Sequence, residues 1–218
     1  MMMNLFSVFD PSSGNLSLNW LSMFIMLLII PGQYWNSPNK MINMLMELYK
    51  KLTQETILHL KKYEPSIIFV SMFMYLLINN IMGLFPYIFT ATAHLTFSMS
   101  MALTLWLSMM LFGWINKTNH MFSHLVPIGT PNILMPFMVL IESISNFIRP
   151  GSLAVRLTAN MIAGHLLMSL LGNNLAENFM MMMMMMWMFM ILMMFELAVA
   201  FIQSYVFMTL STLYSSEI

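Results

Sequence analysis

The sequence predicts an all-α membrane protein with about five membrane-embedded helices, one amphipathic surface helix and a long, tilted helical hairpin at its end. Three observations support this. Hydrophobic residues make up 60% of the 218-residue chain. Charged residues make up only 7%, against roughly 25% in soluble domains. Several apolar stretches approach or exceed the length of about 20 residues that a helix needs to cross a bilayer. We expect residues 1–218 to form a single membrane domain.

Residues 16–30 (LSLNWLSMFIMLLII) have about the minimum length for a spanning helix and are followed by Pro31-Gly32. Residues 36–64 contain five of the eight basic residues, with apolar residues at mixed three- and four-residue spacing. That pattern predicts an amphipathic helix on the membrane surface. Because positive charge concentrates on the inner side of a membrane, we expect this helix inside and the N-terminus outside.

Residues 66–85 and 95–115 are two further apolar stretches of spanning length. The loop between them holds His94 but no Lys or Arg, so we expect it on the outer side, with His94 in solvent. Lys117, His120 and His124 then mark a second inner loop, which agrees with alternation across the membrane.

Residues 133–171 and 179–214 are the two longest apolar segments. A helix of 35 to 40 residues is more than about 50 Å long, whereas the hydrocarbon core is about 30 Å thick. We therefore expect both helices to be strongly tilted or bent, with Pro150-Gly151 as one place to bend. The intervening LGNNLAEN has the Gly and Asn content of a turn and suits an outer loop, which leaves the C-terminus inside.

The composition also limits the chemistry. Eight Lys and Arg balance eight Asp and Glu, without a basic patch that could neutralise a row of phosphates, so nucleic acid is not an expected partner. The chain has no cysteine, which removes thiolate nucleophiles and cysteine-ligated metals. Histidine and carboxylate side chains must carry any chemistry. The 32 methionines, with an unbroken run over 180–186, indicate biased coding, as in a small organellar genome.

A few polar side chains interrupt the last two segments. The six candidates for a functional path are Glu142, Arg156, Asn160, His165, Glu196 and Gln203. At about 100° per residue, Asn160 and Arg149 share a stripe with Arg156, whereas His165 points to the opposite side and lies roughly 13 Å along the axis. Glu196 and Gln203 are seven residues apart and therefore lie on one face of the second helix.

Arg156 has two interpretations. An arginine at the bilayer centre costs about 2.5–3.5 kcal/mol on insertion scales, so it normally faces protein or a water-filled cavity. It either forms a buried structural pair with a carboxylate or acts as a barrier and counter-charge in an ion or proton path. For His165, packing in a core is an equal alternative. For Asn160 and Gln203, hydrogen bonding between helices is an equal alternative.

Four stretches resemble the subunit a family of the mitochondrial ATP synthase, the stationary channel subunit of its membrane sector. They are PIGTPNILMPFMVLIESIS, SLAVRLTANMIAGHLL, ELAVAFIQSYVF and the amino-terminal MNLFSVFDPSS, and the resemblance extends over essentially the whole chain. It implies that Arg156 faces the essential carboxylates of a rotating ring of c subunits. Asn160 and Gln203 would be its polar neighbours at the rotor surface.

The resemblance further implies two aqueous half-channels in the mitochondrial inner membrane. His165 and Glu196 match the half-channel from the intermembrane space, and Glu142 matches the matrix-side exit. The N-terminus would face the intermembrane space and the C-terminus the matrix. Other implied partners are the remaining membrane-sector and peripheral-stalk subunits, the lipid bilayer and protons, with no cofactor and no metal. Arg149 adds a charge where relatives can be uncharged.

Other functions fit less of the sequence. A haem-bearing redox subunit would need paired histidines deep in two spans, and only His165 is deep. An intramembrane metalloprotease would need an HExxH motif, which does not occur. No GxxxxGK[ST] motif occurs either, so we expect a non-catalytic chain without direct nucleotide binding. A solitary transporter is the strongest rival.

Overall fold

The computed structural model describes residues 5–30, 37–61, 63–126, 129, 131, 133–177 and 179–217. Over these residues the chain forms helices and no strand, which confirms the predicted all-α class. The α-helices are α1 (Ile25–Ile29), α2 (Lys40–Leu60), α3 (Glu64–Gly83), α4 (Leu95–Asn116), α5 (Thr118–His124), α6 (Met135–Glu177) and α7 (Phe179–Ser216). The 3-10 helices are η1 (Leu5–Phe9), η2 (Leu18–Phe24) and η3 (Ala91–Ala93).

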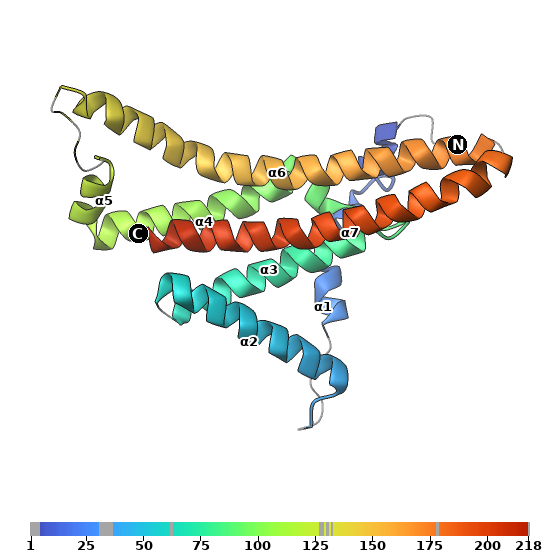
Figure 1. Ribbon diagram of the computed structural model, residues 1–218, viewed down its shortest axis with the longest axis horizontal. Helices are drawn as coiled ribbons and strands as arrows, with labels where there is room; N and C mark the ends of the chain where they lie inside the picture. The colour runs from blue at the N-terminus through green and yellow to red at the C-terminus, as the bar shows by residue number, and fades with distance from the viewer. Residues whose placement is uncertain are drawn as a thin grey trace.

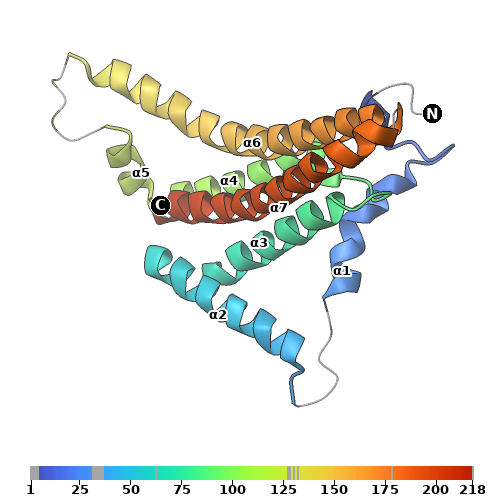
Figure 2. The same cartoon turned by 45° about the vertical axis from the view of Figure 1, so that its right-hand side comes forward.

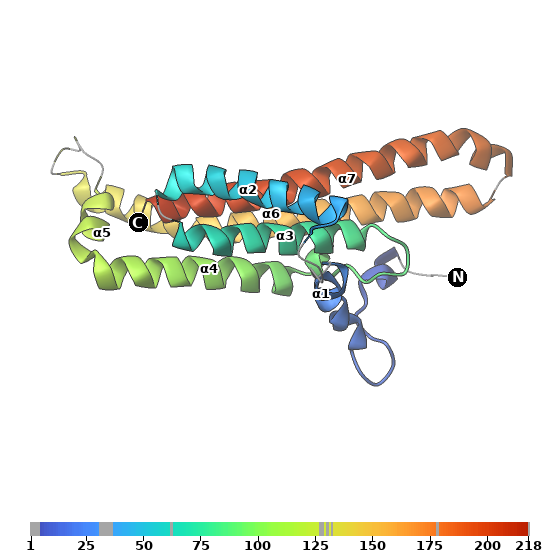
Figure 3. The same cartoon turned by 90° about the horizontal axis from the view of Figure 1, so that it is seen from below.

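Four of the described helices are long and apolar enough to cross a membrane. These candidate spans are Glu64–Gly83, Leu95–Asn116, Met135–Asn173 and Met185–Ser216. They belong to α3, α4, α6 and α7, and they run side by side in one elongated bundle (Figures 1 and 3). The two longest, α6 and α7, form an antiparallel hairpin along the whole length of this bundle (Figure 1).

The helices of the bundle are held together by a core that α3, α4, α6 and α7 share. Leu76, Phe97, Leu157 and Phe207 are buried there, one from each of these helices. Burying one such side chain contributes roughly 1.5–3 kcal/mol relative to water. In a bilayer the hydrophobic contribution to helix association is smaller, because lipid tails are also apolar. Close van der Waals packing between the helices then holds them together. The core fixes which face of α6 turns inward.

Helix α2 diverges from α3 below the bundle, and α1 crosses the direction of the long helices steeply (Figure 2). Leu45, Tyr49 and Leu52 of α2 pack against the buried side chains of α3 and α7. On α7, the Tyr205 hydroxyl donates a hydrogen bond of 3.3 Å to Oε2 of Glu55, which ties the two helices together. One side of α2 therefore packs against the bundle.

The predicted first spanning helix, residues 16–30, differs from the structure. Residues Leu18–Phe24 form 3-10 helix and only Ile25–Ile29 form α-helix. Twelve residues in these two conformations extend roughly 20 Å, less than the hydrocarbon thickness of about 30 Å. Mean hydropathy reports how apolar a segment is, but it does not report how much of that segment is regular helix.

The predicted turn at 171–178 is also different. Helix α6 continues to Glu177 and α7 begins at Phe179, so the hairpin connection is shorter than the Gly and Asn content suggested. No proline stands in LGNNLAEN, and glycine or asparagine alone costs a helix only about 1 kcal/mol or less. Pro150 lies inside α6 without ending it. α6 changes direction along its length, consistent with a proline bend (Figures 1 and 2).

Candidate functional site

Helix α6 has an inner face and an outer face in the region of Arg156. Leu153, Ala154 and Leu157 are buried in the core. On the other side a stripe of exposed residues recurs every three or four positions, and we call it the α6 stripe. Its members are Ser152, Val155, Arg156, Ala159, Asn160, Ala163 and Leu167. Because Ser152, Ala159 and Ala163 carry small side chains, another helix could approach the α6 backbone closely at these positions.

Arg156 lies in the middle of the α6 stripe with its side chain exposed. Among the described residues, no carboxylate lies within ion-pairing distance of its guanidinium, and no hydrogen bond holds it. The buried structural pair that was one interpretation of Arg156 is therefore not present within the described part of the chain. A guanidinium in the middle of a candidate membrane span needs an anion or water, which the described part of the chain does not supply.

Asn160 and Gln203 are brought together across the hairpin. Asn160 lies one turn from Arg156 on the α6 stripe, and its Nδ2 donates a hydrogen bond of 2.9 Å to Oε1 of Gln203. Gln203 belongs to α7 and is only 5% exposed. The contact links the two helices beside the arginine, as the hydrogen-bonding alternative predicted, and it leaves only Asn160 on the exposed surface.

Glu196 is a buried carboxyl group on the inner face of α7. It is 7% exposed, and neither of its oxygens has a hydrogen-bond partner among the described residues. The carboxyl group lies directly against the backbone of α6 at Gly164, where an added Cβ would stand 2.9 Å from both Cδ and Oε1. A buried carboxyl group without partners is costly in its ionised form, so this position favours a group that binds a proton or meets water.

His165 follows Gly164 in α6 and therefore lies in the same part of the hairpin as Glu196. Its Nε2 is buried and has no hydrogen-bond partner within the described chain, so it is not bonded to Glu196. The imidazole packs edge-on against Phe9 of η1, with ring centroids 6.1 Å apart. The histidine thus has both an apolar contact and an unsatisfied polar atom.

A further group of buried polar side chains lies where α3 leads into α4. Within the described part of the chain, the side chains of this group that have buried polar atoms without a hydrogen-bond partner are Asn79, Asn80, Thr90, Thr92 and His94. The intervening helix η3 packs on α6 and α7, where Ala93 meets Met161 and Ala200. Met161 is four positions before His165, and Ala200 is four positions after Glu196. The expectation that His94 is in solvent is wrong, because its ring packs between Trp20 and Phe89.

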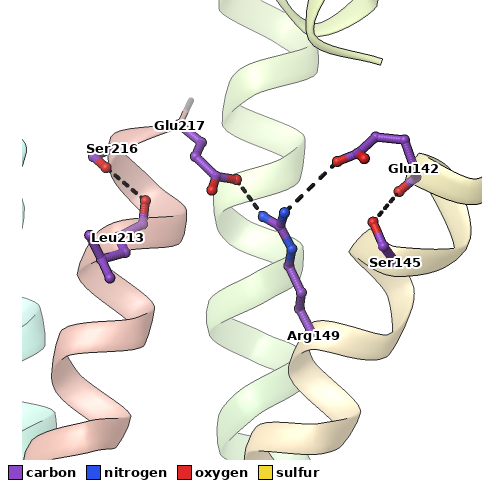
Figure 4. A network of polar contacts seen from close by, with 6 residues as sticks. All are labelled: Glu142, Ser145, Arg149, Leu213, Ser216 and Glu217. Carbon is purple, nitrogen blue, oxygen red and sulfur yellow. Dashed lines mark hydrogen bonds and ion pairs between the residues drawn. The ribbon is translucent and has the colours of Figure 1, made fainter. Parts of the chain in front are cut away.

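Glu142 lies on the other side of Arg156, near the N-terminal end of α6. It forms an ion pair of 3.8 Å with Arg149, which is also bound to Glu217 at the end of α7 (Figure 4). Along α6, Glu142 is 14 residues from Arg156, or about 21 Å, and His165 is nine residues away in the opposite direction, or about 13 Å. Arg156 therefore separates the two groups of titratable side chains.

Glu217, Tyr214 and Gly164 were not identified from the sequence as site residues. The contacts of Glu217 and Tyr214 depend on the register of the hairpin, which brings residue 217 beside residue 149. Arg149 is the residue that could have pointed to Glu217 and Tyr214, because a second charge in the same membrane helix needs a partner. No group of three or more potential metal ligands occurs among the described residues.

Comparisons with known proteins identify the family of the chain. A model of the family described as ATP synthase A chain matches residues 16–216. The chain is 58% identical to ATP synthase subunit a of Drosophila melanogaster, 57% to that of Aedes aegypti and 56% to that of Anopheles gambiae. Each match covers 100% of both chains. The chain therefore belongs to the ATP synthase A chain family.

Proposed function

We propose that this chain is the non-catalytic, proton-translocating subunit of an F-type ATP synthase, and that it forms two half-channels at the surface of a rotating c-subunit ring. The observation that carries the proposal is Arg156, which is exposed in the middle of the α6 stripe and has no carboxylate partner among the residues that the structure describes. A permanent cation at this place needs an anionic partner that the described chain does not supply. Carboxylates on a passing ring would supply it in turn.

The α6 stripe supports a moving partner. Ala159 and Ala163 leave room for a close approach by ring helices, and Asn160 offers a polar neighbour to Arg156. A ring carboxylate that meets Arg156 is favoured in its ionised form, because an opposite charge lies nearby. Arg156 itself stays protonated and repels any proton that would cross directly between the half-channels.

The uptake half-channel would be formed by Glu196 and His165. Both carry buried polar atoms that have no partner among the described residues, and η3, beside the polar side chains of the α3 to α4 connection, packs one helical turn away from them. A proton passing this group neutralises a ring carboxylate, which can then face lipid at far lower cost than an anion. Rotation then carries the neutral group away from Arg156.

The exit half-channel would be formed at Glu142. After nearly a full turn the ring carboxylate approaches Arg156 from the other side, ionises, and releases its proton toward Glu142. The two half-channels are offset along α6, so a proton crosses the membrane only by riding on the ring. Each 100 mV of potential contributes about 2.3 kcal/mol per charge moved.

The proposed function implies which partners the chain has and in which membrane it lies. The partners are the c-ring, other membrane-sector subunits, the peripheral stalk, the lipid bilayer and protons, while nucleotide chemistry belongs to other chains. We place the chain in the mitochondrial inner membrane as a multi-pass protein. Its N-terminus would face the intermembrane space and its C-terminus the matrix. The reason is that five of its eight basic residues lie in one segment, which the positive-inside rule places on the matrix side. These five are Lys40, Lys50, Lys51, Lys61 and Lys62.

Replacement of Arg156 tests the proposal. In membrane vesicles containing the assembled complex, Arg156→Ala should abolish ATP synthesis and uncouple proton flow from rotation, because the barrier between the half-channels is lost. Ser152→Ala, on the same stripe, should behave as wild type. Normal ATP synthesis by the Arg156→Ala complex would refute the proposal, whereas transport by the isolated chain would favour a solitary transporter.

The side assignment has its own test. When the external proton concentration is low, Glu196→Gln should slow proton uptake more than Glu142→Gln does, because uptake then limits the flow. Proton flux would be followed with a pH-sensitive dye on each side of the vesicle membrane. Equal effects of the two substitutions would remove the assignment of Glu196 to uptake and Glu142 to exit.

A further inference from the structure

Arg149 belongs to α6 but is held mainly by α7. Its Nη1 donates a hydrogen bond to Oε2 of Glu217. Its guanidinium carbon also lies 5.1 Å from the centre of the Tyr214 ring, a cation–π distance. Tyr214 lies in the last turn of α7 and Glu217 directly follows that helix, and both contact the same guanidinium. Both contacts draw the guanidinium toward α7.

The contact of Arg149 with Glu142 is looser. The distance from Nη2 to Oε1 of Glu142 is 3.8 Å, which is close enough for ionic attraction but too long for a hydrogen bond. Figure 4 shows the guanidinium between the two carboxylates, with Glu217 on one side and Glu142 on the other. One positive charge is therefore shared unequally by two acids, and the tighter bond belongs to Glu217.

The unequal sharing occurs beside a cavity. Arg149, Tyr214 and Glu217 line a space of about 230 Å³ together with Ser143, Asn146 and His124. The side chains of Arg149 and Glu142 are 27% and 29% exposed, whereas that of Glu217 is exposed, at 39%. Solvent therefore screens these charges in part, and the geometry of the contacts decides how they are shared.

We propose that Glu217 is a positioning residue for Glu142: by binding Arg149, it keeps the guanidinium from closing on Glu142 and so leaves that carboxylate able to take up a proton. A guanidinium in direct hydrogen bond with a carboxylate opposes protonation of that carboxylate. Without Glu217, Arg149 is free to form that bond with Glu142. This inference rests on the proposed function, in which Glu142 receives the outgoing proton.

The inference predicts a rescue. In vesicles containing the assembled complex, Glu217→Gln should lower proton flux roughly tenfold, the cost of breaking one charge-assisted hydrogen bond before each release. Adding Arg149→Gln should restore most of the flux, because no guanidinium remains to block Glu142. Arg149→Gln alone should have a small effect. Glu47→Gln, which removes an exposed acid on α2, is the matched control and should have none.

The flux is normalised to the amount of assembled complex and measured against matrix-side pH. The other titratable groups facing Arg149 are Glu142 on its own helix, Tyr214 on α7 and, across the cavity, His124 of α5. Wild-type flux in Glu217→Gln would overturn the inference. So would a double variant no faster than Glu217→Gln, since a mere structural clamp gives no rescue. If Arg156→Ala still uncouples while either of these results holds, the proposed function stands and only this inference fails.

Discussion

At the scale of single residues, the site depends on one glycine as much as on its charged groups. Gly164 lies where α6 and α7 approach so closely that the Glu196 carboxyl group touches the α6 backbone. Any larger residue would displace that carboxyl group, although the flexible end of Glu196 can move at small steric cost. A substitution of Gly164 should therefore disturb proton transfer at Glu196 without preventing the protein from folding.

Gly164→Ala should leave assembly of the complex intact and lower proton flux on the order of 10- to 100-fold, as expected for a displacement near 1 Å of a reacting group. Gly172→Ala is the matched control, because nothing lies within 4 Å of an added Cβ there and the same helix gains the same residue type. Flux would be measured as ATP-driven acidification of vesicles. A normal rate for Gly164→Ala would show that the position of Glu196 is not critical.

Residue spacing predicted part of the site and could not predict the rest. The shared stripe of Arg156 and Asn160 follows from helical geometry alone, and both are exposed on one face. The ion pair of Arg149 with Glu217 joins residues 68 positions apart. It depends on the register of the hairpin, which the local sequence does not predict. The assignment of roles to Glu142, Glu196 and Arg156 stays a prediction.

At the scale of the element, α6 combines a packed face with an open one over a single turn. Leu157 is completely buried, whereas the neighbouring Val155 is half exposed. The inner face fixes the rotation of α6 about its axis, and this rotation holds Arg156 on the open face. Packing of the core thus determines where the guanidinium stands.

Leu157→Ala should destabilise the protein by about 2–5 kcal/mol, because it leaves a cavity between α6 and its neighbours. Val155→Ala should cost clearly less, because Val155 is half exposed on the chain and, on the proposed function, meets only a ring that moves past it. The measurement is the thermal stability of the purified complex in detergent, together with the yield of assembled complex. Similar losses for the two variants would contradict the assignment of the two faces of α6.

Hydropathy predicted the apolar segments that became α3, α4, α6 and α7, because length and composition suffice to recognise such helices. It did not predict the 3-10 conformation of Leu18–Phe24 or the helical residues up to Glu177. Intrinsic helix propensities differ by only about 1 kcal/mol per residue or less for residues other than proline, so composition alone does not decide such a choice. Free-energy differences of this size cannot be predicted from amino-acid composition.

At the scale of the whole molecule, the topology is open to a direct test, because the chain has no cysteine of its own. A single cysteine at exposed Tyr87, between α3 and α4, should react with a membrane-impermeant maleimide from the intermembrane side. A cysteine at exposed Lys50 of α2 should react only from the matrix side. The unmodified chain is the control. Labelling of both positions from the same side would contradict the proposed orientation.

The length of α6 has an electrical consequence. A candidate span of 39 residues is about 58 Å long. If it were tilted to lie wholly within about 30 Å of hydrocarbon, each residue would advance only about 0.8 Å in depth. A charge moved by a full helical turn would then shift about 3 Å in depth, or about a tenth of the potential, worth about 0.2 kcal/mol at 100 mV. Such a helix would divide the membrane field into steps smaller than thermal energy, so that relocating a titratable side chain by one turn would hardly change the voltage that it senses.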